Sequence, residues 1–438
     1  MKKTKTMTLC AMALMTAVSC SETETGIELE PGGDGGQVAL GVAANLKVDA
    51  GTKAATKSVV SGSTLSYPKA DFSTNAPGLG ILVTNSNSTG WYSPDAANGG
   101  YTGHHVWYMG DENGAKWISI NEKGETYAAT TETPYYLTAT VGKVYAYYPY
   151  DTDVTTNPST ISSEADLKIP VGITASGSID ASTNNAKKYW NTSSKNWSPR
   201  LTANKVNQSD AAEKDYLYFA GSDGRNVNNG RAEGQTPFDP EGGPTNNDAD
   251  NPGYQINLDM NHALAMVSFR VYDGGQLSSN AVNFTKFVIK NHDGGTNLFK
   301  TGTGKMWLKD GTISDNSTTG TLTRTVSNYI LMRQINDAAA QGEYAFVENG
   351  SQVNGQAVSR TVSAIVYPTV FGENEIDVVV TLQEGGNEAV EYTVTLPGYE
   401  WTAGSNCIYT FSAGRNKLTV MDVSVQEWSD DEQADIPL

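Results

Sequence analysis

The sequence has little of what most catalytic and metal-binding sites need. Its 438 residues include three cysteines and four histidines. No HExxH pair, CxxC pair or GxSxG turn occurs, so the common zinc motifs and the nucleophile of α/β-hydrolases are excluded. We therefore expect no metal, no cofactor and no enzymatic activity.

Cysteine is too scarce for a disulfide framework. Cys10 lies in an N-terminal leader and Cys20 stands at its end, which leaves Cys407 alone. The folded part must therefore be held together by apolar cores. Cys407 lies in a strand-like run, where we expect a buried small hydrophobe rather than a nucleophile.

Basic charge is also in short supply. The chain has 30 Lys and Arg against 48 Asp and Glu, a formal net charge of −18. A surface of this sign repels phosphate backbones and anionic lipid headgroups. We therefore expect no nucleic-acid partner.

No hydrophobic run is long enough to cross a bilayer as a helix. The apolar run 7–18 follows three lysines and ends in Ala-Val-Ser-Cys at 17–20. This pattern is typical of a bacterial lipoprotein signal, so we expect residues 1–19 to be removed and Cys20 to be acylated, with palmitate among its chains. The protein would then be anchored to lipid of the outer membrane. An ordinary signal peptide that happens to contain a cysteine is the alternative.

Long helical periodicity is nearly absent, and short β-branched and aromatic runs alternate with Gly, Asn and Asp turns. This alternation predicts an all-β fold of the sandwich type. We expect a flexible tether at 20–37, an N-terminal β-sandwich domain at 38–253 and a C-terminal β-sandwich domain at 254–438. The boundary is placed to within about twenty residues.

The run from Val38 to Leu46 has one strongly apolar face. Val38, Leu40, Val42 and Leu46 alternate with small residues, as expected for a strand that buries one side. A polar linker follows it at 47–64.

Two features leave binding functions open. The long loop 221–253 contains Asn246, Asp248 and Asp250, which have calcium-loop spacing, although the glycine and glutamate of that motif are missing. Aromatic residues near polar loops can stack on sugars or cap a sandwich core. These residues are Trp91, Tyr92, Trp107, Tyr108, Trp190 and Trp197.

Several segments resemble the fimbrillin family, the β-rich type V pilins of Bacteroidales fimbriae. The resemblance rests on VYAYYPY at 144–150, DYLYFA at 215–220, LDMNHALAMVSF at 258–269, the hairpin WTAGSN with Tyr409 at 401–409, and Trp428. The matches keep their order and span most of the chain.

The resemblance implies two transthyretin-like β-sandwich domains and a structural subunit of adhesive fimbriae. Such subunits travel as lipoproteins, lose an N-terminal strand to a protease, and accept a strand from another subunit in its place. Partners would be other fimbrial subunits, in a homo- or hetero-polymer, and host or bacterial surface ligands. A strand withdrawn from a sheet leaves an unpaired edge and an apolar trough, which an added strand repairs.

The removable strand would be marked by Val38, Leu40, Val42 and Leu46, and cleavage would follow Lys47, Lys53 or Lys57. The best-known members of the family are cut after arginine, and the first arginine here is Arg200. Either a lysine is used, or the chain is not cut and serves as an anchor or accessory subunit.

The C-terminal strand is the candidate donor to a neighbouring subunit, with a phase slip at Asp422 that predicts a β-bulge. Its apolar residues are Leu418, Val420, Val423, Val425 and Trp428. If this strand stays in its own sandwich, the chain resembles a tip subunit that does not donate. A surface glycan-binding lipoprotein is the alternative to a pilin.

Overall fold

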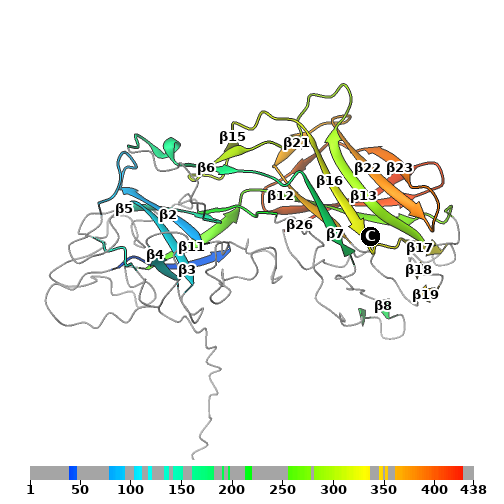
Figure 1. The fold of residues 1–438 in the computed structure, drawn as a ribbon, viewed down its shortest axis with the longest axis horizontal. Coiled ribbons are helices and arrows are strands. Elements are labelled where there is room, and N and C mark those ends of the chain that lie inside the picture. The colour runs from blue at the N-terminus through cyan, green and yellow to red at the C-terminus, as the bar shows by residue number, and fades with distance from the viewer. Residues whose placement is uncertain are drawn as a thin grey trace, which may run out of the picture.

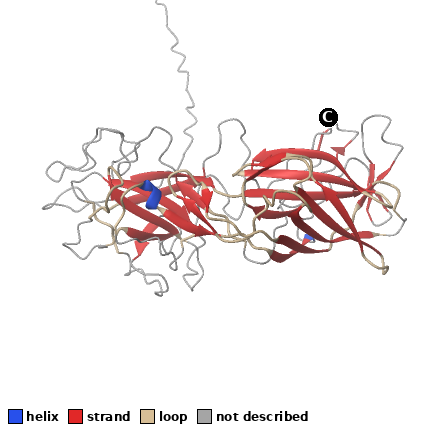
Figure 2. Ribbon diagram, turned by 90° about the horizontal axis from the view of Figure 1, so that it is seen from above, coloured by secondary structure: helices blue, strands red, loops and turns tan. Residues whose placement is uncertain are grey.

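The computed structural model describes fifteen stretches of the chain, and in these stretches the regular secondary structure consists almost entirely of strands, joined by loops and turns (Figure 2). They are residues 39–46, 78–93, 103–110, 117–120, 133–137, 142–150, 160–181, 190–191, 196–197, 213–219, 255–277, 281–335, 345–348, 351–353 and 361–427. Their helical structure is limited to 3₁₀ turns, namely η1 (Glu164–Asp166) and the single residue Ala181. The all-β prediction is confirmed. The same stretches contain no helix long and apolar enough to cross a membrane.

The sheets form two groups that lie end to end (Figures 1 and 2). The N-terminal group is a seven-stranded sheet with β1 and β4 at its edges. In spatial order its strands are β1 (Gly41–Leu46), β11 (Gln255–His262), β10 (Leu217–Phe219), β5 (Gly142–Tyr148), β2 (Leu79–Asn85), β3 (His105–Gly110) and β4 (Trp117–Ile120).

The C-terminal group is a sandwich of two sheets. The first contains β19 (Ser351–Val353), β18 (Ala345–Glu348), β17 (Met332–Ile335), β12 (Ala265–Asp273), β25 (Ser405–Ala413) and β26 (Leu418–Glu427), with β20 (Val362–Val366) paired to β12. The second contains β23 (Val390–Thr395), β22 (Ile376–Glu384), β13 (Val282–Asn291), β16 (Thr321–Ser327) and β7 (Ser176–Asp180). One apolar core, which includes Phe269, Phe287 and Tyr409, fills the space between them.

Three small sheets complete the fold. They are β15 (Ile313–Ser314), β14 (Gly304–Trp307) and β6 (Lys168–Val171); β21 (Thr369–Phe371) and β24 (Tyr399–Trp401); and β8 (Trp190–Asn191) and β9 (Asn196–Trp197). The sheet around β14 lies where the two groups meet. There a separate core joins Tyr147 of the N-terminal group to Met266 and Ile365 of the sandwich through Met306.

Strand pairing crosses the expected domain boundary in both directions. Strand β11 follows residue 253, yet it pairs with β1 and β10 of the N-terminal sheet. Strands β6 and β7 precede that residue, yet they pair with β14 and β16 near or within the C-terminal sandwich. The division at 253/254 stays a prediction, and the pairing favours a later division near 263–264, between β11 and β12.

A buried ion pair fixes the segment before β10 against the sandwich. The guanidinium of Arg324 on β16 donates to a carboxylate oxygen of Glu213 and, at 2.8 Å, to the carbonyl of Thr174. Both charged side chains are almost fully buried. Removal of one partner from such a pair leaves an uncompensated charge in the core, so this contact holds sequence-distant segments in one arrangement.

Three Gly-rich turns end strands as the sequence indicates. Strand β12 ends at Asp273, β13 at Asn291 and β22 at Glu384. The glycines just beyond these ends, Gly275, Gly294 and Gly385, all have positive φ. Glycine reaches this conformation without the steric cost that a side chain brings.

Candidate strand-exchange groove

Strand β1 lies in a groove between two segments that come from distant parts of the chain. Along its whole length it pairs in parallel with β11, from Gly41 opposite Gln255 to Leu46 opposite Met260. On its other side, Ala39 forms an antiparallel bridge with Tyr136. The strand is thus held on both sides at its N-terminal end.

Two apolar side chains at the N-terminal end of β1 point into a core, Leu40 just before the strand and Val42 within it. Leu40 is 2% exposed and Val42 is 7% exposed, and both belong to one apolar cluster that also contains Leu258 of β11. Gly41 between them is half-buried. This alternation follows from the period of two along a strand, and it makes β1 part of the wall of the N-terminal core.

Two hydrogen bonds fix the main chain of Leu40. Its N–H donates to the carbonyl oxygen of Tyr135 at 2.8 Å. Its carbonyl oxygen accepts from the phenol of Tyr108 on β3 at 2.7 Å. Tyr108 is 1% exposed, and the ring of Tyr135 lies 6.3 Å from that of Tyr92, so aromatic residues line this end of the groove. Sequence reasoning did not assign Tyr108 or Tyr135 to the groove, because each comes near β1 only through the tertiary fold.

The other residues expected to take part in strand removal lie partly outside the described stretches. Val38, Lys47, Lys53 and Lys57 lie outside them, as does Cys20. Leu46 is the last residue of β1, and its side chain is not described. The chain leaves β1 at residue 46 and re-enters the described part at residue 78, just before β2. Strand removal and cleavage after a lysine therefore stay predictions.

The candidate donor strand lies in its own sandwich. Strand β26 pairs antiparallel with β25 from Leu418 to Glu427 and forms the outer edge of its sheet. The register shifts between Val420 and Asp422, so that Met421 is an extra residue, as the phase slip indicates. Trp428 lies outside the described stretches.

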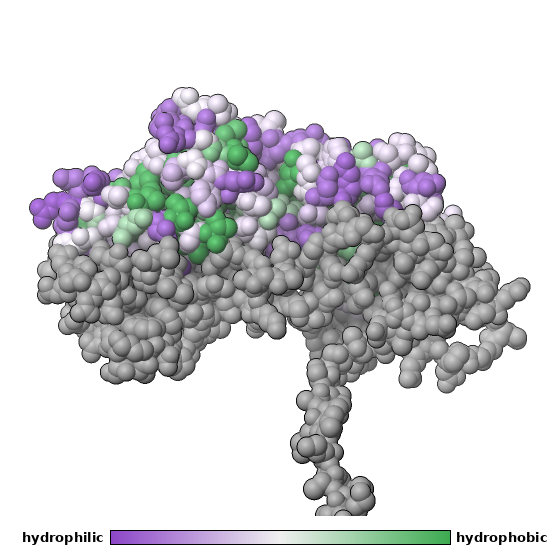
Figure 3. Space-filling model, turned by 180° about the vertical axis from the view of Figure 1, so that it is seen from behind, coloured by the Kyte–Doolittle hydropathy of each residue, from purple (hydrophilic) through white to green (hydrophobic). Residues whose placement is uncertain are grey.

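Strand β26 is far more exposed than β1. Leu418 is buried, while Val420 and Val423 pack partly against the sandwich core. Met421 is 44% exposed and Val425 is 48% exposed. In the space-filling view, apolar side chains appear among polar ones over the C-terminal group of sheets, on the left of Figure 3.

The buried thiol and histidines have structural partners. Burial raises the pKa of Cys407 to about 11, so the thiol is an inert core residue, as expected. His262 is half-buried, and its Nδ1 lies 3.0 Å from the carboxylate of Asp215. Burial and, secondarily, His104 lower the pKa of His105 to about 4, and the Nε2 of His105 lies 3.0 Å from the hydroxyl of Tyr147.

The aromatic residues considered for glycan stacking divide into three sets. Tyr92 and Tyr108 are buried in the N-terminal core. Trp91 is half-buried and stacks on the ring of His104, with centroids 3.8 Å apart. The side chains of Trp107, Trp190 and Trp197 are not described. Within the described residues, this arrangement favours the structural interpretation of the aromatics.

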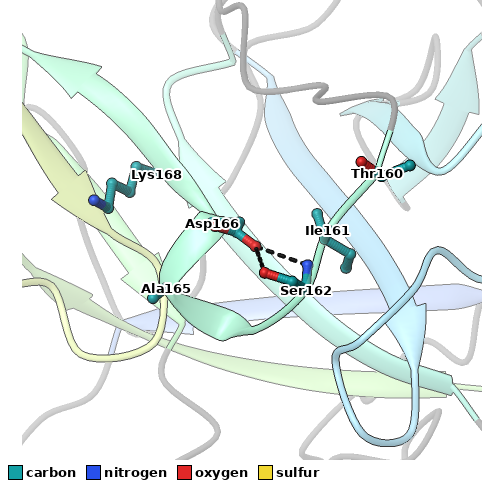
Figure 4. A pocket seen from close by; sticks show the side chains of 6 residues that line it. All are labelled: Thr160, Ile161, Ser162, Ala165, Asp166 and Lys168. Atoms are coloured by element: carbon teal, nitrogen blue, oxygen red, sulfur yellow. Dashed lines mark hydrogen bonds between the residues drawn. The ribbon is translucent and has the colours of Figure 1, made fainter.

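An open pocket of about 530 Å³ lies beside η1 (Figure 4). Its walls are Thr160, Ile161, Ser162, Ala165, Asp166 and Lys168. The Asp166 carboxylate accepts from the main-chain N–H of Ser162 at 2.7 Å and from its hydroxyl at 2.8 Å, and these bonds lower the pKa of Asp166. Lys168 extends away from Asp166 in Figure 4, and its ammonium lies over the ring of Trp307. Asp166 and Ser162 thus bind each other, whereas Lys168 contacts Trp307 outside the pocket lining.

The motifs that suggested metal or phosphate sites give no such site in the described part of the chain. There, no three His, Cys, Asp or Glu side chains are grouped closely enough to hold a metal ion. The run GTGK at 302–305 is similar to the end of a phosphate-binding loop, but its Gly304 and Lys305 lie in β14, which pairs with β15 across a hairpin. Asn246, Asp248 and Asp250 lie outside the described stretches.

Comparison with known proteins shows the family. Residues 105–428, well over half of the chain, match the family model described as fimbrillin-like. The chain belongs to this family, which groups pilin-type adhesion subunits of cell-surface fimbriae. The fimbrillin resemblance seen in the sequence is therefore confirmed. Among curated proteins, none matches.

The solved structures that this chain matches include proteins from Bacteroides and Porphyromonas species. A putative cell adhesion protein from Bacteroides uniformis is 13% identical, with 91% of this chain and 100% of that one covered and a TM-score of 0.42. A fimbrial protein from Bacteroides vulgatus is 14% identical, with coverages of 90% and 100% and a TM-score of 0.46. The tip fimbrial protein Mfa3 from Porphyromonas gingivalis is 10% identical, with coverages of 83% and 97% and a TM-score of 0.32.

Proposed function

We propose that this protein is a structural pilin that is assembled by strand exchange at the β1 groove. It is exported with the signal 1–19, acylated at Cys20 and carried to the cell surface on the tether 20–37. Cleavage after Lys47, Lys53 or Lys57 frees β1, and a strand of another subunit replaces it. The role is mechanical and adhesive, and no catalytic step is assigned to the chain itself.

One observation carries this proposal, namely the position of β1. It is an edge strand of its sheet, yet its side chains close an apolar core. Withdrawal of β1 would therefore bare both the edge of β11 and the sites of Leu40 and Val42. These two side chains alone represent roughly 3 to 6 kcal/mol of gross burial energy, which a new strand could recover.

The position of the subunit in the fimbria depends on β26. A stalk subunit would have to withdraw β26 from β25 and insert it into the next groove. A tip subunit keeps β26 where the structure has it and only accepts a strand. The continuous pairing of β26 with β25 supports the tip position.

The N-terminal residue of the surface-exposed protein tests the proposal, measured by mass spectrometry of fimbriae sheared from cells. A start just after Lys47, Lys53 or Lys57 in high-molecular-weight polymer is expected. Intact acylated Cys20 on a monomer would contradict strand removal. Polymer that ends at this subunit would indicate the tip, and polymer made of repeated copies would indicate the stalk.

A matched pair of variants strengthens this test. Replacement of Lys47, Lys53 and Lys57 by glutamine should keep the protein acylated and monomeric. The control replaces three lysines outside the linker, Lys300, Lys305 and Lys417, by glutamine and should assemble normally. If both variants assemble equally well, the proposal that cleavage follows a linker lysine is wrong.

A further inference from the structure

We infer that Tyr108 sets the register of whichever strand occupies the β1 groove. We also infer that the groove accepts an extended strand of another subunit only when that strand runs parallel to β11. This inference rests on the proposed strand exchange and names the kind of strand that the groove takes.

Tyr108 recognises main chain rather than side chain. Its phenol, buried in the N-terminal core, donates to the carbonyl oxygen of Leu40 at 2.7 Å. Every residue offers such a carbonyl, so the contact can serve β1 and any strand that replaces it. Because Tyr108 belongs to β3, it stays in place when β1 leaves.

The position of this carbonyl is tied to that of the apolar side chains. Next to it, the N–H of residue 40 donates to the carbonyl of Tyr135, and residue 39 bridges Tyr136. A slip by one residue would turn Leu40 and Val42 out of the core and take the carbonyl away from Tyr108. The groove therefore selects a strand with apolar residues two positions apart, the first of them not proline.

The direction of the strand follows from the same contacts. The N-terminal end of β1 meets Tyr136, and its C-terminal end meets Met260 of β11. An antiparallel strand would offer its N–H and carbonyl groups in a different pattern, because parallel and antiparallel ladders differ in spacing. It would thus fail to match both Tyr135 and Tyr108.

Release of a nicked β1 tests the role of Tyr108. The protein is the chain from residue 20 onward with Cys20→Ser and a specific protease site inserted between Lys53 and Ala54. After cleavage, excess fluorescent peptide of sequence 37–48 displaces the N-terminal segment, and its release is followed by mass spectrometry. Loss of one buried hydrogen bond should make release roughly 10-fold faster in Tyr108→Phe.

Tyr145→Phe is the matched control. Tyr145 is equally buried on β5, but its hydroxyl bonds Ser88 rather than β1. Release should change less than about 2-fold in this variant, because its lost bond does not involve the departing strand. A second peptide has an ester in place of the amide between Leu40 and Gly41, which weakens the carbonyl as an acceptor. It should bind more weakly to the wild type than the normal peptide does, and this difference should shrink in Tyr108→Phe.

The outcomes separate the two proposals. If the wild type never exchanges β1, the proposed function fails. If the wild type exchanges and Tyr108→Phe releases β1 at the same rate, only the register role of Tyr108 fails.

A photo-crosslinker on the peptide N-terminus should label the segment around Tyr136, and labelling around Met260 instead would overturn the parallel direction. A peptide with Leu40→Pro should not exchange, and its exchange would overturn the requirement at that position.

Discussion

Strands β1 and β26 are both outermost strands of their sheets, but they are seated in opposite ways. Strand β1 is bound on one side by β11 and on the other by Tyr135 and Tyr136. Strand β26 is bound by β25 and leaves its outer side at the edge of the sheet. The outer side of β1 is thus covered by residues 135 and 136, whereas the outer side of β26 forms the edge of its sheet.

Side-chain burial follows the same difference. The described apolar residues of β1 are buried with the N-terminal core, whereas Met421 and Val425 of β26 stand about half exposed. Loss of β1 would therefore expose the apolar core of the N-terminal group to water. Loss of β26 would remove a strand whose apolar side chains are already partly exposed. An outermost strand can thus either complete a buried core, as β1 does, or cover one side of a sandwich, as β26 does. The burial of its apolar side chains distinguishes the two cases.

Large-to-small substitutions should show the difference most strongly. Leu40→Ala should lower the free energy of unfolding of the N-terminal group by about 2 to 5 kcal/mol, because it removes core contacts and leaves a cavity. Val425→Ala should change the stability by less than about 0.5 kcal/mol, because the side chain is half in water. Urea titrations followed by circular dichroism measure both. Equal losses for the two variants would show that β1 does not close a core.

Acid should weaken the sheet that holds β1. Burial lowers the pKa of His105 to about 4, so the folded state prefers the neutral imidazole. The unfolded state takes up the proton near pH 6.5, so this stability is complete above pH 6.5 and is lost as the pH falls towards 4. The loss from His105 should approach about 3 kcal/mol.

A variant without the titrating ring isolates this effect. His105→Gln removes the imidazole, so the difference in unfolding free energy between wild type and variant should change between pH 7 and pH 4. Burial also lowers the pKa of His104, but this residue is present in both proteins, so its contribution largely cancels from the difference. A difference that stays constant over this range would show that folding does not lower the pKa of His105.

Much of the fold follows from local pattern. The runs at 79–84, 284–291 and 407–413 are strands in the structure, because alternating apolar residues and Gly turns act over a few residues. The stretch 151–214 is mostly polar, yet β6 and β7 lie in it. Their sequences, KIPV and SGSID, carry little apolar signal, and they become strands by pairing with β14 and β16. Tertiary pairing of this kind overrides weak local propensity.

Only the strand that fills the groove could be predicted from the sequence, and the residues that line the groove could not. The alternation at Leu40 and Val42 indicates a strand with a buried face, but it does not show what that face meets. Tyr108, Tyr135 and the β11 edge are distant in sequence and converge only in the fold. The parallel direction of β1 against β11 likewise depends on the whole topology, which no local pattern specifies.

The smallest effect concerns the bulge that interrupts β26. Thr410 pairs with Asp422 and Phe411 with Val420, so Met421 is the extra residue. Bulges and charges blunt exposed edges and limit pairing with other chains. Deletion of Met421 should keep both flanking pairs and change the stability by less than about 1 kcal/mol. It should also create a flatter edge that associates through β26 as protein concentration rises.

Sedimentation velocity over a range of protein concentrations detects this association. Addition of Val425→Lys to the deletion should restore the monomer, because a charge on the new edge opposes pairing between copies. A deletion variant that stays monomeric at all concentrations would show that the bulge does not protect the edge. The corresponding deletion of Ala43 in β1 should instead lower the stability of the N-terminal group. It shifts the pairing of β1 with β11 by one residue and turns the following side chains to the other face of the sheet.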